Sequence, residues 1–140
     1  MQHTLSYYST ILYKDFFAFA TDELLELGLN YGAIPFIIYV GKFPNCTPAE
    51  LTHAMKIDWG YSQRSITKLV QLKFMTKVKD TENGRNYHLN LTKTGKEAYK
   101  LSHKVFFSWD DEKLNVLNSS EKSELFYLLG KLTRNRSDSQ

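Results

Sequence analysis

Hydrogen-bonding and basic side chains share one side of a helix expected from Trp59 to Lys73. On a helical wheel at about 100° per residue, the side expected to pack inward carries Trp59, Ser62, Ile66, Leu69, Val70 and Lys73. Opposite them lie Tyr61, Arg64, Lys68 and Gln71, with Gly60, Gln63 and Thr67 on the flank. This outward face has no acid and has the donors that base edges and phosphates of duplex DNA require. Taken alone, the same pattern also fits an ordinary solvated helix.

A basic β-hairpin is expected directly after this helix. Its predicted buried face carries Thr76, Val78, Tyr87, Leu89 and Leu91, which alternate with Lys77, Lys79, His88 and Asn90. That period of two is typical of strands with one solvated face. The tip contains Asn83-Gly84, a strong hairpin signal, and presents Arg85 and Asn86. A guanidinium on a β-loop suits the negative potential of a minor groove, although an arginine in such a loop is also commonly only solvated.

A short helix is expected before the first one, from Thr47 to Lys56. Thr47-Pro48-Ala49-Glu50 is a strong helix start, with a threonine cap, proline at the first position and a capping-box glutamate. Leu51, Ala54 and Met55 form a narrow stripe expected to face inward, and Asp58 is positioned to cap the next helix. Two helices joined by a tight turn and followed by a hairpin predict a winged helix-turn-helix over Thr47–Gly95.

The distribution of charge supports that interpretation. The net charge is only +3, but residues 56–104 carry 11 basic and 4 acidic side chains, while the segments on either side are slightly acidic. Such an excess is either a solvated lysine-rich face or an electrostatic footprint for phosphates, since Lys and Arg release condensed counterions when they bind DNA.

The run from Thr47 to Gly95 resembles the DNA-binding module of the MarR family of bacterial transcriptional regulators. The match aligns without gaps through Glu50-Leu51, Asp58 and Ile66 to Leu69, and then through Arg85 to Leu91-Thr92-Lys93-Thr94-Gly95. The wing arginine and the Leu-Thr-x-x-Gly run are the family's most recognisable signature. Two positions depart from the pattern: Asn83 stands where an acid is usual, and Lys73 where a helix-ending glycine is usual.

The flanking segments predict helices. Leu5, Tyr8, Leu12, Phe16 and Phe19 recur at helical spacing in a long first helix rich in aromatic residues, which fits either a core or a subunit interface. A buried second helix is expected from about Pro35 to Lys42. A long helix should follow Thr92, and a last helix, begun by an Asn118–Glu121 capping box, carries Leu125, Leu128, Leu129 and Leu132 on one stripe.

These elements define the expected fold class and organisation. The fold should be mostly α with a small β-hairpin wing (α+β), within a single compact domain. Residues 1–32 form an N-terminal dimerisation helix, residues 33–95 the winged helix-turn-helix, and residues 96–140 the C-terminal dimerisation helices. The resemblance implies that the end helices of two subunits interlock, which would hold two recognition helices about one turn of DNA apart on a pseudo-palindromic operator.

Other classes of function find little support in the sequence. There is no glycine-rich phosphate loop, nucleophile motif or His/Cys cluster at metal-ligand spacing, so neither an enzyme, a cofactor nor a metal site is predicted. Cys46 is the only cysteine; it is either an oxidation sensor or, more in keeping with its place, a small structural residue. Neither a secretory signal nor an apolar run long enough to span a membrane is found, which predicts a cytoplasmic protein without membrane contact.

The prediction is therefore a homodimeric, sequence-specific DNA-binding transcriptional regulator, and a repressor rather than an activator. Its expected DNA contacts are Gly60, Tyr61, Gln63, Arg64, Thr67, Lys68, Arg85 and Asn86. The resemblance also implies release of DNA by a small aromatic or amphipathic effector in a cleft between the dimer helices and the DNA-binding module. The alternative is a winged helix that binds proteins and has no operator.

Overall fold

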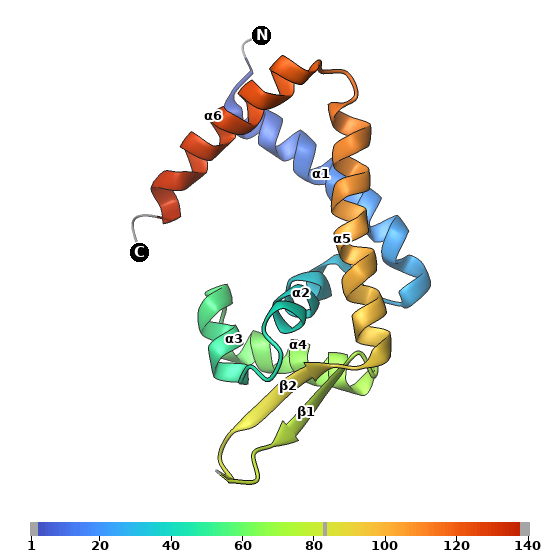
Figure 1. Cartoon of the computed structure of the whole chain (residues 1–140), viewed down its shortest axis with the longest axis vertical. Helices are drawn as coiled ribbons and strands as arrows, with labels where there is room; N and C mark the ends of the chain where they lie inside the picture. Colours follow the sequence, from blue (N-terminus) through green and yellow to red (C-terminus); the bar gives the residue numbers. More distant parts are fainter. Residues whose placement is uncertain (1–2, 83, 138–140) are drawn as a thin grey trace. The chain divides into compact units, whose positions relative to one another are not determined.

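Helices make up most of the chain, and one β-hairpin interrupts them (Figure 1). The computed structural model describes residues 3–82 and 84–137, with side chains described up to residue 134. The elements are α1 (Leu5–Leu24), η1 (Leu25–Leu27), η2 (Tyr31–Ala33), α2 (Ile34–Lys42), α3 (Pro48–Met55), α4 (Trp59–Gln71), β1 (Met75–Lys79), β2 (Tyr87–Leu91), α5 (Lys93–Leu114) and α6 (Ser119–Ser137). This order confirms the predicted fold class, a mostly helical chain with a hairpin wing.

By internal packing, the chain divides into two compact units, residues 1–106 and residues 107–140. In the first unit, α2, α3 and α4 gather at the base of the hairpin, which extends away from them (Figure 1). In the second, the Asn118–Glu121 capping box forms as predicted: the N–H of Glu121 donates to Asn118 Oδ1 at 2.8 Å, and the N–H of Asn118 donates to Glu121 Oε1 at 2.9 Å. Leu128, Leu129 and Leu132 of α6 remain exposed.

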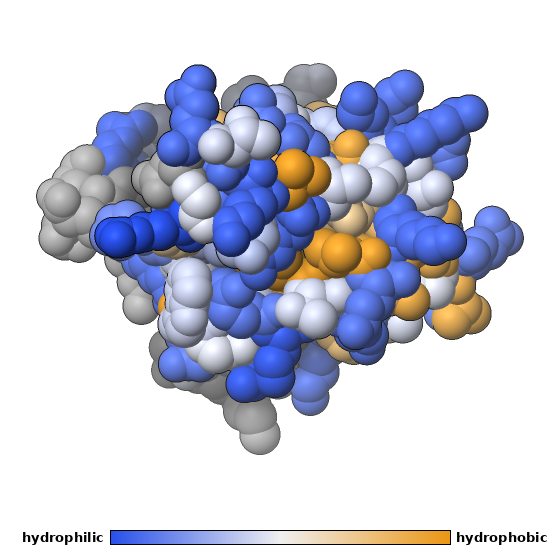
Figure 2. Space-filling view, turned by 90° about the horizontal axis from the view of Figure 1, so that it is seen from below, coloured by the Kyte–Doolittle hydropathy of each residue, from blue (hydrophilic) through white to orange (hydrophobic). Residues whose placement is uncertain are grey.

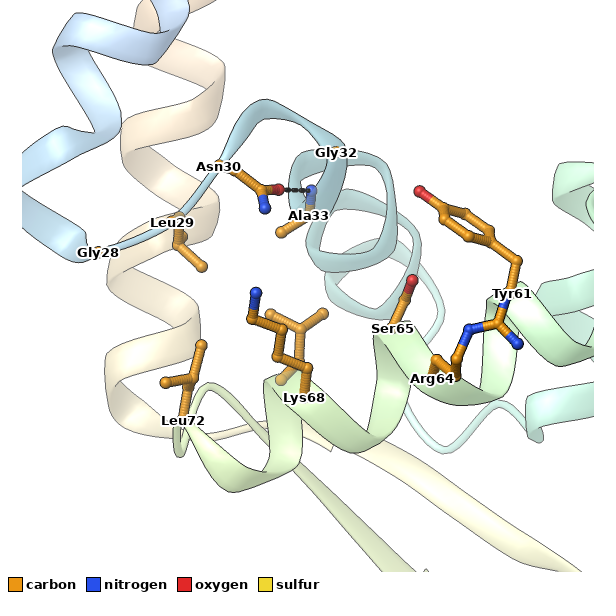
Figure 3. Close-up of a pocket in the computed structure, with 11 residues that line it drawn as sticks. Gly28, Leu29, Asn30, Gly32, Ala33, Tyr61, Arg64, Ser65, Lys68 and Leu72 are labelled. Carbon is orange, nitrogen blue, oxygen red and sulfur yellow. Dashed lines mark hydrogen bonds between the residues drawn. The ribbon is translucent and has the colours of Figure 1, made fainter.

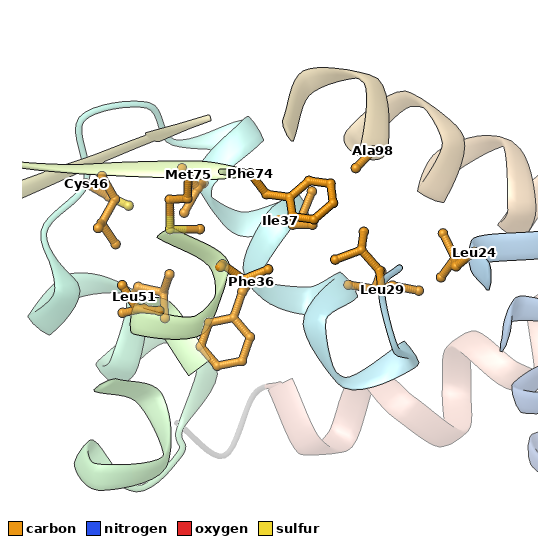
Figure 4. Close-up of a cluster of buried hydrophobic side chains, with 14 residues drawn as sticks. Leu24, Leu29, Phe36, Ile37, Cys46, Leu51, Phe74, Met75 and Ala98 are labelled. Carbon is orange, nitrogen blue, oxygen red and sulfur yellow. The ribbon is translucent and has the colours of Figure 1, made fainter. Parts of the chain in front are cut away.

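The hydrophobic core of the first unit lies between α2, α3, α4 and the base of the hairpin (Figure 4). Helix α2 is almost wholly apolar, and its side chains Phe36 and Ile37 are completely enclosed, as the sequence predicted. Met75 closes the core from β1 and Ala98 from α5. This core, to which α1 also contributes Leu24, fixes the direction of α4.

Burial in α1 goes against the core alternative for its N-terminal half. Leu5, Tyr8 and Leu12 are exposed, Phe16 and Phe19 are half-buried, and the buried residues of the helix, Ala20 and Leu24, lie at its far end. The helix itself is confirmed, capped by Thr4, whose side chain accepts the N–H of Tyr7. Its aromatic N-terminal half is thus an open apolar surface on this chain.

The hairpin corrects the predicted face of β1. The strands pair antiparallel with Met75 opposite Leu91, Lys77 opposite Leu89 and Lys79 opposite Tyr87. Thr76 and Val78 therefore lie on the other face from Leu89, and Val78 is 59% exposed. The reason is that Met75, rather than Thr76, anchors the strand in the core; a shift of one residue moves every side chain to the opposite face.

The start of α5 explains the Leu-Thr-x-x-Gly signature in physical terms. The Thr92 hydroxyl donates to the Lys73 carbonyl at 2.6 Å and accepts the N–H of Gly95 at 3.0 Å. A β-carbon on Gly95 would collide with the carbonyl oxygen of Phe74. The threonine therefore ties the helix start to the end of the recognition helix, and the glycine permits the close approach of the two backbones.

No single helix among the described residues has both the length and the hydropathy of a membrane span. Within the described part of the chain, one bent pair passes the same test by length and composition: Leu5–Leu27 together with Tyr31–Lys42, at an angle of 85°.

Candidate nucleic-acid interface

Local capping sets the position of α4. Thr47 caps α3 by accepting the N–H of Glu50 at 3.1 Å, and Asp58 caps α4 by accepting the N–H of Tyr61 at 3.0 Å. Lys56 makes the turn between the two helices in a left-handed conformation, with φ of 54°. Both predicted caps are confirmed, although α3 is shorter than expected, at 8 residues.

A buried hydroxyl pair joins the two helices of the helix-turn-helix. Thr52 donates to the Pro48 carbonyl at 2.6 Å, and the Ser62 hydroxyl lies 2.6 Å from the Thr52 hydroxyl. Since the Thr52 proton is already used, Ser62 is the donor in this second bond. Ser62 lies on the buried side of α4 together with Ile66 and Leu69, which fixes the rotation of the helix about its axis.

The outward face of α4 has the predicted exposure. Tyr61, Arg64, Thr67, Lys68 and Gln71 are exposed, whereas Gly60 and Gln63 are half-buried. Hydrophilic side chains cover most of the surface on the α3, α4 and hairpin side, around a smaller hydrophobic area (Figure 2). A recognition helix with this surface can offer donors to base edges and cations to phosphates.

Three side chains of the helix-turn-helix are exposed although the sequence predicted them to face inward. Trp59 was expected inward but is 54% exposed, because it occupies the first turn, beyond the reach of the core. Lys73 was also expected inward but lies past the end of α4 and is exposed. Ala54 of α3 is likewise exposed, so the inward stripe of that helix is narrower than predicted.

Two predicted contacts on α4 have particular local environments. A β-carbon at Gly60 would lie 3.1 Å from a carboxylate oxygen of Asp58 and 3.2 Å from Nη1 of Arg64, so glycine leaves room for both groups. The buried Nε2 atom of Gln63 has no hydrogen-bond partner among the described residues. A buried donor without a partner is unfavourable by about 1–3 kcal/mol, which favours its movement toward an acceptor outside the protein.

The hairpin presents the other predicted contacts. Arg85 and Asn86 are exposed in the connection between β1 and β2, which is closed by a bond from the Asp80 N–H to the Asn86 carbonyl at 2.7 Å. Lys77 lies with its Nζ 4.8 Å from the centre of the Tyr87 ring. The structure thus separates the contacts into a helix group and a loop group, as a winged helix requires. Asn83, the departure noted beside Arg85, lies outside the described residues.

A polar network at the base of the hairpin was not predicted from the sequence. His88 Nδ1 lies 2.9 Å from the carbonyl oxygen of Asn45, and its Nε2 lies 3.3 Å from Asp80 Oδ2. The Asn90 amide donates to Asn45 Oδ1 at 2.8 Å. The bond to the Asn45 carbonyl, followed by the bond to Asp80, raises the pKa of His88 above its usual 6.5.

Asn45, which lies at the centre of this network, has an unusual backbone conformation. Its φ is 66°, a left-handed conformation that asparagine tolerates better than most residues. The partners His88 and Asn90 are more than 40 residues away in the chain. Because the pairing depends on tertiary structure, the sequence pattern of the hairpin identified these two only as solvated strand residues.

A pocket of about 240 Å³ lies between α4 and the segment that joins α1 to α2 (Figure 3). Lys68 extends from α4 toward Leu29, across the space between the two segments (Figure 3). The Tyr61 ring leans toward α2, with its centre 6.1 Å from that of Phe36. No acidic side chain lines the pocket, and its lining includes both cations of the recognition helix, Arg64 and Lys68.

A second, more apolar hollow of about 400 Å³ lies against α2. Its lining is aromatic and aliphatic apart from one cation, and consists of Tyr31, Ile34, Pro35, Ile38, Tyr39, Lys42, Phe43, Met55 and Phe106.

Cys46 is a structural residue in this fold. Its side chain is 3% exposed and belongs to the core. Burial, followed by the nearby charge of Glu50, raises the pKa of the Cys46 thiol to about 11. The reactive thiolate is therefore scarce at neutral pH, which argues against the oxidation-sensor alternative. Within the described residues, no group of His, Cys, Asp and Glu side chains could hold a metal ion.

Comparisons with known proteins agree with this geometry. A MarR mutant from E. coli, complexed with operator DNA, has the same fold at a TM-score of 0.76 and 19% identity, covering 91% of this chain and 92% of that one. Streptococcus pneumoniae FabT in complex with DNA has a TM-score of 0.81 at 18% identity, covering 97% of each chain. The HTH-type transcriptional regulator BilQ of Clostridium symbiosum is 38% identical over 136 residues, which cover 97% of this chain and 94% of that protein. The chain belongs to the MarR family.

As a MarR-family member, the chain is a DNA-binding transcriptional regulator. The relatives are regulators, which is not a class of enzymes. No protein-family model matches the sequence. Family membership accounts for the shared order of elements, from the helix-turn-helix of α3 and α4 to the hairpin.

Proposed function

We propose that this MarR-family regulator is a homodimeric repressor that binds a pseudo-palindromic operator. The observation that carries the proposal is the exposed face of α4, where Arg64, Thr67 and Lys68 project to solvent and no acidic residue occurs between Trp59 and Gln71. Because Ser62, Ile66 and Leu69 hold the opposite side in the core, this face keeps one orientation on the surface.

Each predicted contact has a role that suits its chemistry. The planar guanidinium of Arg64 can donate two bonds to one guanine in the major groove, whereas Lys68 suits a phosphate. Tyr61, Gln63 and Thr67 lie beside them, and Gly60 lets the backbone approach the DNA closely. On the hairpin, Arg85 and Asn86 would enter the minor groove, whose negative potential attracts a guanidinium.

The proposed dimer rests on exposed apolar surface at both ends of the chain. Leu5, Tyr8 and Leu12 of α1 are exposed, and so are Leu128, Leu129 and Leu132 of α6. Exposed apolar surface marks an interaction site, and aromatic side chains are enriched at such interfaces. Two-fold symmetry would then set the half-sites about 10 base pairs apart.

A small effector would act through the pocket beside α4. Arg64 and Lys68 line this pocket and also belong to the proposed DNA face. A small aromatic or amphipathic molecule with a negative group could pair with these cations and so remove them from the DNA. Its apolar part would contact Leu29, Ala33 and Leu72. Direct measurement of operator release, compound by compound, tests this part of the proposal.

Selection of duplexes from a random pool tests the central claim. A repressor of this kind should enrich one pseudo-palindrome, and its affinity should fall steeply with salt because several cations displace counterions from the DNA. The alternative function, a winged helix that binds only proteins, would enrich no motif. Enrichment of a site without two-fold symmetry would contradict the dimer but not the DNA binding. We place the regulator in the cytoplasm, because bacterial operators lie there.

A further inference from the structure

The first residue of α4 has an exposure that the proposed contacts do not explain. Trp59 is 54% exposed, although tryptophan has the largest apolar surface of any side chain. Fraying of the helix does not account for it, because Asp58 accepts the N–H of Tyr61 at 3.0 Å through its side chain and the N–H of Ser62 at 2.9 Å through its carbonyl. The indole is therefore held open to solvent at a well-capped helix start.

Trp59 forms one wall of an open hollow between α3 and α4. The hollow has a volume of about 430 Å³ and is lined by Ala49, Thr52, His53, Lys56, Ile57 and Trp59. Its base is rigid, since the buried hydroxyls of Thr52 and Ser62 join the two helices at 2.6 Å. Among the described residues, its lining has Lys56 and His53 and no acidic side chain, so the hollow suits a partner that combines an anionic group with an apolar part.

The neighbouring acids are held by hydrogen bonds of their own and do not line the hollow. The Asp58 carboxylate is engaged as the cap of α4. On α3, the carboxylate of Glu50 accepts a bond from the Thr47 hydroxyl at 3.2 Å. His53 and Lys56 are both exposed and lie between these acids along the chain. Lys56 and the His53 ring are therefore both accessible to a phosphate backbone.

DNA is the partner whose chemistry fits these walls. In a helix-turn-helix, residues at the start of the second helix reach base edges, while the first helix crosses the backbone. The apolar group that DNA exposes in the major groove is the C5-methyl of thymine. We propose that Trp59 contacts a thymine methyl in each half-site, while His53 and Lys56 flank the phosphates of the same strand. This inference rests on the proposed operator binding.

Removing one methyl group at a time from the DNA tests the contact. In the selected operator, each thymine of one half-site is replaced in turn by deoxyuridine, which lacks only the methyl. Burial of one methyl group changes affinity by about fourfold, so the wild type should lose about fourfold at one position. The Trp59→Ala variant should bind the unmodified operator more weakly and lose nothing further at that position. The Trp59→Phe variant should keep part of the methyl dependence.

Controls separate this contact from general damage. Leu25→Ala, also an exposed apolar side chain but outside the winged helix, should leave the deoxyuridine profile unchanged. In a Trp109→Phe background, only Trp59 remains as a tryptophan, and its emission should change when the operator binds. Full methyl dependence in Trp59→Ala, or an unchanged affinity of that variant, would overturn the inference while operator binding stands. A wild type that enriches no duplex would overturn both proposals.

Discussion

Replacing Lys73 by glycine should stabilise the folded protein. Lys73 has φ of 67°, in the left-handed region, directly after α4. The N–H of Phe74 donates to the Leu69 carbonyl at 3.0 Å and the N–H of Lys73 to the Val70 carbonyl at 3.0 Å, which together form a Schellman motif. The position occupied by Lys73 in this motif is usually glycine, because a β-carbon is unfavourable there.

The magnitude follows from two opposing effects. A left-handed conformation costs an L-residue about 1–2 kcal/mol relative to the right-handed one. Glycine avoids this strain but loses about 0.5–1 kcal/mol more than alanine when the chain becomes ordered. The net gain for Lys73→Gly is therefore about 1 kcal/mol, which raises the melting temperature of a chain of this size by about 3–5 °C.

Thermal unfolding at one fixed protein concentration measures this change, since dimer formation would make stability depend on concentration. Lys73→Ala removes the same charge but keeps a β-carbon, so it should show no such gain. Lys79→Gly puts glycine into an extended strand and should lower stability by about 0.5–1 kcal/mol. If Lys73→Gly were no more stable than Lys73→Ala, backbone strain at this position would be refuted.

Three further predictions concern the DNA face, the hairpin and the start of α5. Arg64→Ala should weaken operator binding by about 1–3 kcal/mol and relax specificity at one base pair. Lys68→Ala should weaken binding to all duplexes alike and lower the salt dependence of the affinity (the slope of log K against log salt) by about one. Titration of each variant with DNA measures both effects. The pKa of His88 is raised above 6.5 in the folded state, so its contribution to stability should be complete below pH 6.5 and vanish as the pH rises through the folded-state pKa. Denaturant titration of the wild type and of His88→Gln across this pH range measures the contribution. A stability difference that does not change with pH would contradict the prediction. Gly95→Ala should lower stability by about 1–3 kcal/mol in thermal unfolding, because the added carbon meets backbone.

The features predicted correctly from the sequence depend on short-range interactions. The caps of α3, α4 and α6 each involve residues three positions apart, so their patterns are complete within the local sequence. The same holds for the buried side of α4, where Ile66 and Leu69 follow the helical period. The resemblance to the MarR family extended this local information to the order of all the elements.

The predictions from the sequence were wrong where the tertiary position of a residue decides whether its side chain is buried. Trp59 matches the inward side of the helical period but lies one turn beyond the core, so it is exposed. In β1, the alternation of Thr76 and Val78 with lysines is equally compatible with either face, and the contact of Met75 with the core decides between them. His88 bonds to the carbonyl of Asn45, in a loop more than 40 residues away, which no local pattern encodes.

Core burial and polar bonds at the base of the hairpin together set the distance between the two proposed DNA contacts. The outer part of the hairpin is exposed, as Val78 illustrates, and cannot hold its own direction by packing. Met75 and Leu89 bury its base in the core, and two polar connections add to this: the bond from Thr92 to the carbonyl of Lys73, and the network of His88 with the loop before α3. The first joins the hairpin to the end of α4, and the second joins it to the segment that leads into α3. In the proposed complex α4 and Arg85 reach two grooves of one duplex, so the packing and the bonds at the base of the hairpin define the spacing that the operator would have to match.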